Sequence, residues 1–348
     1  MPLSAPLYAL AAAALFGLAT PVAKLLIGSA DPWLLAGLFY LGSGLGLAAL
    51  RAGRSMRKVA GEAALSRRDA PWLGGAIFFG GIVGPLLLMA GLARTEAASA
   101  SLLLTLEGAA TALIAWFAFR EGVDRRVASG MGLIVAGAIV LAWQGAARPA
   151  GFLGPAAIVG ACIAWGIDNN LTRKVALADP LEIAMYKGLI AGPVSMALAL
   201  AQGAAVPGLA VIAAAALVGF LGYGISLVLF VIALRYLGTA RTGAYFSTAP
   251  FVGAAAAIPL LAEPLSATLL IAGVLMGAGV WLHLTERHAH EHEHEAVEHE
   301  HRHTHDEHHR HAHTAHDPPG EPHSHRHVHG RLRHAHAHMP DSHHRHSH

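Results

Sequence analysis

Histidine and cysteine are almost absent from the first 282 residues, which contain no histidine and a single cysteine, Cys162. Without paired thiols, neither a disulfide framework nor a thiolate metal site can form. Without histidine, Ser-His-Asp triads and zinc hydrolase sites lack their parts, and no glycine-rich phosphate loop is present. We therefore expect a protein that is not an enzyme, and any ATP-driven activity would require a partner subunit.

Charge is also scarce, because only 13% of the chain is charged while 54% is hydrophobic. Stretches of about 20 residues that are apolar on every side recur along residues 1–286, which is the length that crosses a bilayer. We predict an all-α integral membrane protein that lies in the lipid bilayer. Its ten spans fall at roughly 6–27, 32–50, 71–92, 97–118, 127–144, 152–173, 180–201, 209–233, 243–262 and 265–284.

The basic residues predict an orientation. The loop after the second span carries six of them, and that side of the membrane also receives seven more from later loops. The opposite side keeps only Arg94 and Arg148. Because cytoplasmic loops are enriched in Lys and Arg, we expect both termini to be cytoplasmic, in a protein of the cell inner membrane.

The second half of this region echoes the first. "LFGLATPVAKLLIGSADPWLLAG" (15–37) pairs with "AWGIDNNLTRKVALADPLEIAM" (164–185), and "FREGVDRRVASGMGLIVAGAIVL" (119–141) pairs with "LAEPLSATLLIAGVLMGAGVWL" (261–282). Each half has five spans, so the two copies enter the membrane from opposite sides. Inverted repeats of this kind are typical of secondary transporters. We place the first five-helix repeat at residues 1–144 and the second at 151–286.

The aromatic–Gly pairs "FG" and "WG", the five-plus-five helices and the polar turns at Glu121 and Glu263 resemble the drug/metabolite transporter (DMT) superfamily, EamA type. "ALRYLGTARTGAYFSTAP", which ends at Pro250, is similar to that family's ninth helix. The resemblance covers about 280 residues and implies export of a small metabolite. The first half departs from this family pattern at one position. There the residue that corresponds to Pro250 is Gly108, and the residue before Gly108 is Glu107.

Glu107 is the clearest candidate for a transport residue. It lies in "SLLLTLEGAATALIAWF", about ten residues from either end of its span. A charge at that depth costs about 2.5–3.5 kcal/mol on insertion scales. It is either a coupling site for a proton or another cation, or a neutral glutamic acid bonded to a neighbouring helix.

The stretch "WGIDNNLTRK" (165–174) places Trp165, Asp168, Asn169 and Asn170 where an apolar helix should continue. The matching stretch of the first half, "FGLATPVAK", contains Thr20. Polar residues and helix breakers at matched positions point to a transport site near the membrane midplane. Alternatively, the two asparagines mark only the end of the sixth span, and Trp165 is a packing residue.

Two lysines lie inside spans. Lys187, about seven residues into the seventh span, either reaches back to the membrane surface or pairs with Asp168 or a substrate carboxylate. Lys24, near the end of the first span, is expected to be a surface anchor.

Residues 287–348 hold 24 of the 25 histidines, with ten acidic residues and seven arginines. This tail has almost nothing to bury, so we predict that it is disordered. Its His-x-His spacing suits Zn²⁺, Ni²⁺ or Co²⁺, and we take as candidate metal ligands His288, His290, His292, His294, His299, His301, His303 and His305. The alternative is a solvated segment that becomes cationic in acid.

Three hypotheses follow. The protein is a metabolite exporter whose tail senses or buffers metal, a divalent metal transporter fed by the tail, or a membrane-tethered metal store or sensor. We favour the first, because the spans offer carboxylates and amides and no histidine before His283. It requires no cofactor; its partners would be a small-molecule substrate, a proton as coupling ion and a second copy in a homodimer, and we expect no nucleic-acid partner.

Overall fold

The computed structural model describes residues 5–56, 65–119, 125–145, 149–175 and 178–285, together with four segments of the tail. The first half contains α1 (Ala5–Ile27), α2 (Pro32–Met56), α3 (Ala70–Ala76), η1 (Ile77–Val83), α4 (Gly84–Leu92), α5 (Ala97–Leu103), α6 (Leu106–Phe119) and α7 (Arg125–Gly145). After the short η2 (Pro149–Phe152), the second half contains α8 (Leu153–Thr172), α9 (Pro180–Ala201), α10 (Leu209–Val218), η3 (Gly219–Ile225), α11 (Ser226–Phe246), α12 (Ala249–Leu261) and α13 (Ala267–Leu284).

These helices confirm the predicted fold class. Within the described residues, seven helical stretches are long and apolar enough to cross a membrane, and Ala249–Leu261 and Ala267–His283 are shorter apolar helices. The remaining predicted span, the sixth, is the 20-residue helix α8. The protein is therefore a multi-pass membrane protein.

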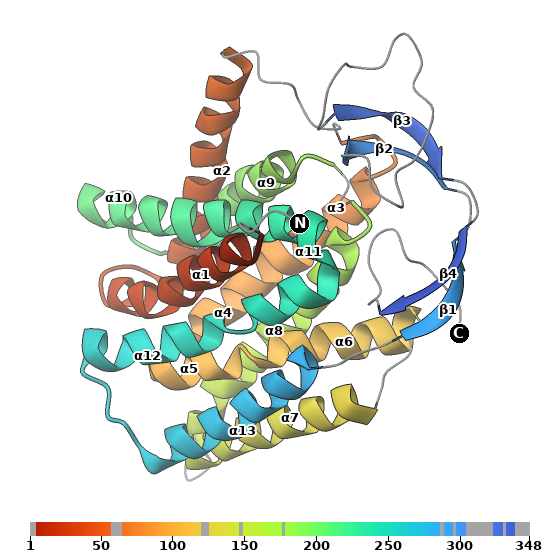
Figure 1. Ribbon diagram of the computed structural model, residues 1–348. Helices are drawn as coiled ribbons and strands as arrows, with labels where there is room; N and C mark the ends of the chain where they lie inside the picture. Colours follow the sequence, from red (N-terminus) through yellow and green to blue (C-terminus); the bar gives the residue numbers. More distant parts are fainter. Residues whose placement is uncertain are drawn as a thin grey trace.

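The two halves are interleaved. The first helix of the first half, α1, packs against η3, α11 and α12 of the second half, and α8 packs against η1, α4 and α6 of the first. The pairs α2·α9 and α7·α13 each join one helix from either half, and they lie side by side in Figure 1. Exchanging the halves leaves this set of contacts unchanged, as an internal repeat requires.

Two kinds of helix irregularity occur at corresponding positions of the two halves. The third and eighth spans each contain a seven-residue π-helical segment, η1 and η3, whose first residues Ile77 and Gly219 are 142 positions apart. The fourth and ninth spans are each interrupted by a two-residue turn, at Leu104–Thr105 and at Ser247–Thr248. Leu104 and Ser247, the first residues of these two turns, are 143 positions apart. π-Helical segments are rare, so their occurrence at matched positions of the two halves supports the internal repeat.

One boundary differs from the prediction. The sequence predicts a link between the eighth and ninth spans at residues 234–242, but α11 carries helical backbone from Ser226 to Phe246 through it. The residues of this stretch are mostly helix-compatible, and its single glycine, Gly238, does not end the helix. The ninth span thus consists of the end of α11 and α12.

Two charged side chains hold the connection between the third and fourth spans. Lys24 Nζ donates hydrogen bonds to the carbonyl oxygens of Leu92, 2.6 Å away, and Thr95, 2.8 Å away. The carboxylate of Glu263 accepts from the backbone N–H groups of Ala97 and Ala98 at 2.6 and 2.8 Å, and so caps the start of α5. Lys24 is therefore bound within the protein, which corrects its expected role as a surface anchor.

Four segments of the tail are described, each as a β-strand. β1 (Ala289–His294) pairs antiparallel with β4 (Leu332–Ala337), and β2 (Val297–His303) pairs with β3 (His323–His329). The alternation of histidine with other residues has the period of a strand, and pairing satisfies backbone groups that would otherwise be left to water. The rest of the predicted tail lies outside the described residues.

The contact between α2 and α9 leaves no room for side chains at its closest point. A methyl group added at Gly188 would overlap the backbone of Gly44 and the carbonyl oxygen of Tyr40. Such close backbone approach is how small residues pack helices in membranes.

We predict that Gly188→Ala destabilises the folded protein by about 1–3 kcal/mol, because α2 and α9 must move apart. The measurement is the temperature at which half of the detergent-solubilised protein is lost from the monodisperse peak. Gly132→Ala on α7 is the matched control, since nothing lies within 4 Å of a methyl group there. Equal midpoints for both variants would contradict the prediction.

Candidate functional site

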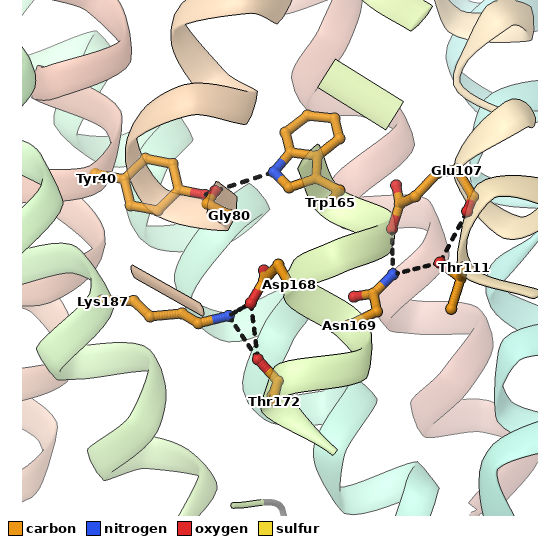
Figure 2. Close-up of polar contacts among 9 residues, drawn as sticks. All are labelled: Tyr40, Gly80, Glu107, Thr111, Trp165, Asp168, Asn169, Thr172 and Lys187. Atoms are coloured by element: carbon orange, nitrogen blue, oxygen red, sulfur yellow. Dashed lines mark hydrogen bonds and ion pairs between the residues drawn. The ribbon is translucent and has the colours of Figure 1, made fainter. Parts of the chain in front are cut away.

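The end of α8 carries a buried ion pair. Lys187 Nζ on α9 lies 2.5 Å from Asp168 Oδ1 and donates a second hydrogen bond to Thr172 Oγ1 at 3.0 Å. Thr172 in turn donates to Asp168 Oδ1 at 2.8 Å, which closes a triangle of three side chains (Figure 2). Asp168 is 7% exposed and Lys187 is 4% exposed. Lys187 therefore does not reach back to the surface; it pairs with Asp168.

A second cluster joins α8 to α6. Asn169 Nδ2 donates to Glu107 Oε1 at 2.9 Å and to Thr111 Oγ1 at 3.1 Å. Thr111 Oγ1 donates to the carbonyl oxygen of Glu107 at 2.8 Å. Glu107 lies in the first turn of α6, directly after the Leu104–Thr105 interruption. A carboxyl group there sits at a helix N-terminus inside the membrane, where the free backbone N–H groups favour a polar or ionised partner.

The remaining α8 residues bind backbone. Asn170 Nδ2 donates to the carbonyl oxygens of Gly166, at 2.8 Å, and Thr111, at 3.1 Å. Trp165 Nε1 donates to the carbonyl oxygen of Gly80 in η1 at 3.0 Å. Figure 2 shows Tyr40 approaching the same oxygen from the other side, with a hydrogen bond of 2.7 Å.

The structure thus brings together six of the residues that the sequence singles out: Trp165, Asp168, Asn169 and Asn170 on α8, Glu107 on α6 and Lys187 on α9. Thr20 is buried in α1, and among the described residues it makes no hydrogen bond to these six. Of the candidate metal ligands, His288 and His305 lie outside the described residues. The other six have only their backbone placed, in β1 and β2.

Sequence reasoning did not identify Tyr40, Gly80, Thr111 or Thr172. The two threonines had a usable signal, because each lies four residues after a carboxylate and so shares its helix face. Gly80 is needed because a methyl group there would overlap the carboxylate of Asp168. Tyr40 lies in an apolar stretch, and nothing local distinguishes it from a packing aromatic.

The Asp168–Lys187 pair has no charged counterpart at the corresponding positions of the first half. By the "FG"/"WG" pairing, Asp168 corresponds to Ala19, and by the Asp-Pro pairing Lys187 corresponds to Phe39. Gly222 of η3 meets Ala19 just as Gly80 of η1 meets Asp168. The backbone arrangement is therefore duplicated, while the charged groups occupy one copy only.

Comparison with known proteins identifies the class. The model of the EamA-like transporter family matches the chain twice, at residues 3–143 and 152–285. These matches cover most of the chain, so the protein belongs to the EamA-like transporter family. The family confirms the resemblance seen in the sequence and indicates a transporter rather than an enzyme.

One curated relative and one solved structure are similar to the chain. An uncharacterized transporter from Methanothermobacter thermautotrophicus is 28% identical over 282 residues, which cover 77% of this chain and 82% of the relative. A protein crystal structure with 19% sequence identity superposes with a TM-score of 0.60 over 81% of this chain and 97% of its own. At that identity the likeness is one of fold.

We predict that Lys187→Met destabilises the protein by about 3–5 kcal/mol, because it leaves the Asp168 carboxylate buried without a counter-charge. The double variant Asp168→Asn/Lys187→Met should recover most of this loss, since neither charge remains. Thermal denaturation of the purified single and double variants measures the coupling. A loss in the double variant equal to the sum of the losses in Lys187→Met and Asp168→Asn would show that the pair is not an interacting unit.

Proposed function

We propose that the protein is a secondary active exporter of a small metabolite, in which Glu107 is the coupling site for a proton and the two inverted repeats alternate access to it. The observation that carries the proposal is the position of Glu107. Its carboxyl group follows a helix interruption in the middle of a span and binds Asn169 from the other repeat. Interrupted helices at the interface of repeats are where secondary transporters place substrate and ions.

The hydrogen bond between Glu107 and Asn169 links the state of one carboxyl group to the contact between repeats. Asn169 offers two N–H donors and one carbonyl acceptor, so it can bond either to a carboxylate or, after rotation, to a carboxylic acid. Uptake and release of a proton at Glu107 would then change which atoms of α6 and α8 are paired. A coupled transporter needs such a link between occupancy and conformation.

Asp168 and Lys187 would contribute to substrate binding. The pair is neutral when closed, and a substrate with a carboxylate or an ammonium group could exchange with one of its members. Thr172 would then hold the displaced side chain, because its hydroxyl group both donates and accepts. The excess of Lys and Arg on one side predicts that this end of the site faces the cytoplasm of a bacterial inner membrane, so export would begin here.

A small metabolite is favoured over a metal ion as the substrate. Among the side chains that the structure describes, no three His, Cys, Asp or Glu residues gather as a potential metal site. Of the two carboxylates near the centre, Asp168 is already paired with Lys187. We propose that metal acts instead on the tail, where histidines alternate with other residues, and that Zn²⁺, Ni²⁺ or Co²⁺ bound there regulates export.

We predict that Glu107→Gln abolishes coupled transport and leaves the protein folded, because the amide oxygen can still accept from Asn169 but cannot exchange a proton. Everted vesicles from expressing cells are given an inside-acid pH gradient and the small-molecule fraction of a cell extract. Accumulated compounds are identified by mass spectrometry. At least one should accumulate with the wild type and with the exposed control Glu96→Gln, and not with Glu107→Gln or after the gradient is collapsed. Identical contents in all vesicles would refute the proposal.

We also predict that truncation after Glu286 removes high-affinity metal binding and leaves metal-free export unchanged. Calorimetric titration with Zn²⁺, Ni²⁺ and Co²⁺ measures the first effect, and the vesicle assay measures the second. Flux of radiolabelled metal that survives the truncation but is lost with Glu107→Gln would instead make the spans a metal transporter.

A further inference from the structure

One backbone carbonyl group in the third span cannot be satisfied by its own helix. In η1 the hydrogen bonds run from residue i+5 to residue i, as shown by Gly84 N–H, which donates to the carbonyl oxygen of Phe79. The next bond of this series would run from residue 85 to Gly80. Residue 85 is proline and has no N–H group, so the carbonyl oxygen of Gly80 is left without a helical partner.

Two side chains from different halves of the protein supply the missing donors. The hydroxyl group of Tyr40 on α2 donates to Gly80 O at 2.7 Å, and Trp165 Nε1 on α8 donates at 3.0 Å. No water inside the bilayer can replace these bonds. A carbonyl group left unpaired there costs several kcal/mol. They attach the π-helical segment to α2 on one side and to α8 on the other.

The eighth span lacks this arrangement. The bond corresponding to Gly84–Phe79 is present there, from Ser226 N–H to the carbonyl oxygen of Leu221. The residue that follows is Leu227, which retains its N–H group, so the helix can satisfy Gly222 without help. Among the described residues, no side chain donates to the carbonyl oxygen of Gly222.

We propose that Tyr40 and Trp165 are positioning residues of the transport cycle, which hold the carbonyl oxygen of Gly80 and thereby keep η1 closed over Asp168. The inference rests on the proposed transport function, because it assigns these bonds to one of the alternating states. Gly80 lies directly against the Asp168 carboxylate, with no space for even a methyl group between them. Movement of η1 away from α2 and α8 must break both bonds and uncover the Asp168–Lys187 pair.

The single cysteine provides a reporter of this opening. Cys162 lies on α8 one turn before Trp165, is fully buried, and its thiol donates to the carbonyl oxygen of Leu103 at 3.6 Å. Alkylation by N-ethylmaleimide therefore requires α8 to separate from its neighbours. Its rate can be measured by mass spectrometry on the full-length protein, without any substrate.

We expect Tyr40→Phe to accelerate alkylation of Cys162 roughly two- to ten-fold, which corresponds to the loss of one hydrogen bond. Pro85→Ala restores an N–H group that can bond to Gly80, as Leu227 does in the other half. In that background the same Tyr40 substitution should have little effect. Tyr223→Phe is the matched control, because its ring packs 5.5 Å from that of Tyr40 and its hydroxyl group has no partner among the described residues.

An unchanged alkylation rate in Tyr40→Phe would overturn the proposal, as would an equal acceleration with and without Pro85→Ala. General loosening of the fold would accelerate alkylation in both backgrounds and in Tyr223→Phe, so it counts against the proposal too. If Tyr40→Phe does not fold, Trp165→Phe takes its place with the same expectations. Because the assay contains no transported compound, its result stands whether or not the vesicle experiment finds a substrate.

Discussion

A bilayer offers no water to an unpaired peptide group, and this constraint explains most of the irregular features of the structure. At three of the places where the backbone departs from an α-helix, side chains from elsewhere in the chain bind the unpaired groups. Glu263 binds the N–H groups at the start of α5, Lys24 binds the carbonyl groups at the end of α4, and Tyr40 and Trp165 bind Gly80. The polar residues of the spans therefore belong to two groups, those that complete the backbone and those to which we assign the proposed transport site.

The fold was accessible from the sequence because lipid imposes a simple pattern. Apolar runs of about 20 residues predict the spans. The odd number of spans in each repeat predicts that the second repeat enters the membrane from the opposite side. The interior of the spans was less accessible. The π-helical segments and the Leu104–Thr105 interruption depend on contacts between residues far apart in the chain, and no local periodicity signals them. The link at 234–242 was misplaced for the same reason, since composition alone does not show where a helix bends.

The charged residues of the candidate site could be predicted from the sequence, but most of their hydrogen-bond partners could not. Glu107, Asp168 and Lys187 were identifiable because ionisable groups are costly in a membrane, and the pairing of Lys187 with Asp168 was one of the open alternatives. From the sequence alone, Asn169 fitted a transport site and the end of the sixth span equally well. In the structure it bonds to Glu107. Thr20 was selected by symmetry with the second half, and among the described residues it makes no hydrogen bond to the other candidates.

The backbone contact between Gly44 and Gly188 has a consequence for biosynthesis. These residues are 144 positions apart, which corresponds to roughly 7–30 seconds at about 5–20 residues per second of chain elongation. During that interval α2 is already in the membrane, and the face that will contact α9 has only lipid beside it. The first repeat cannot complete its packing before the ribosome has delivered the second, so the two repeats become a stable unit together. A stop in translation between them would leave α2 without the helix that its glycine face contacts.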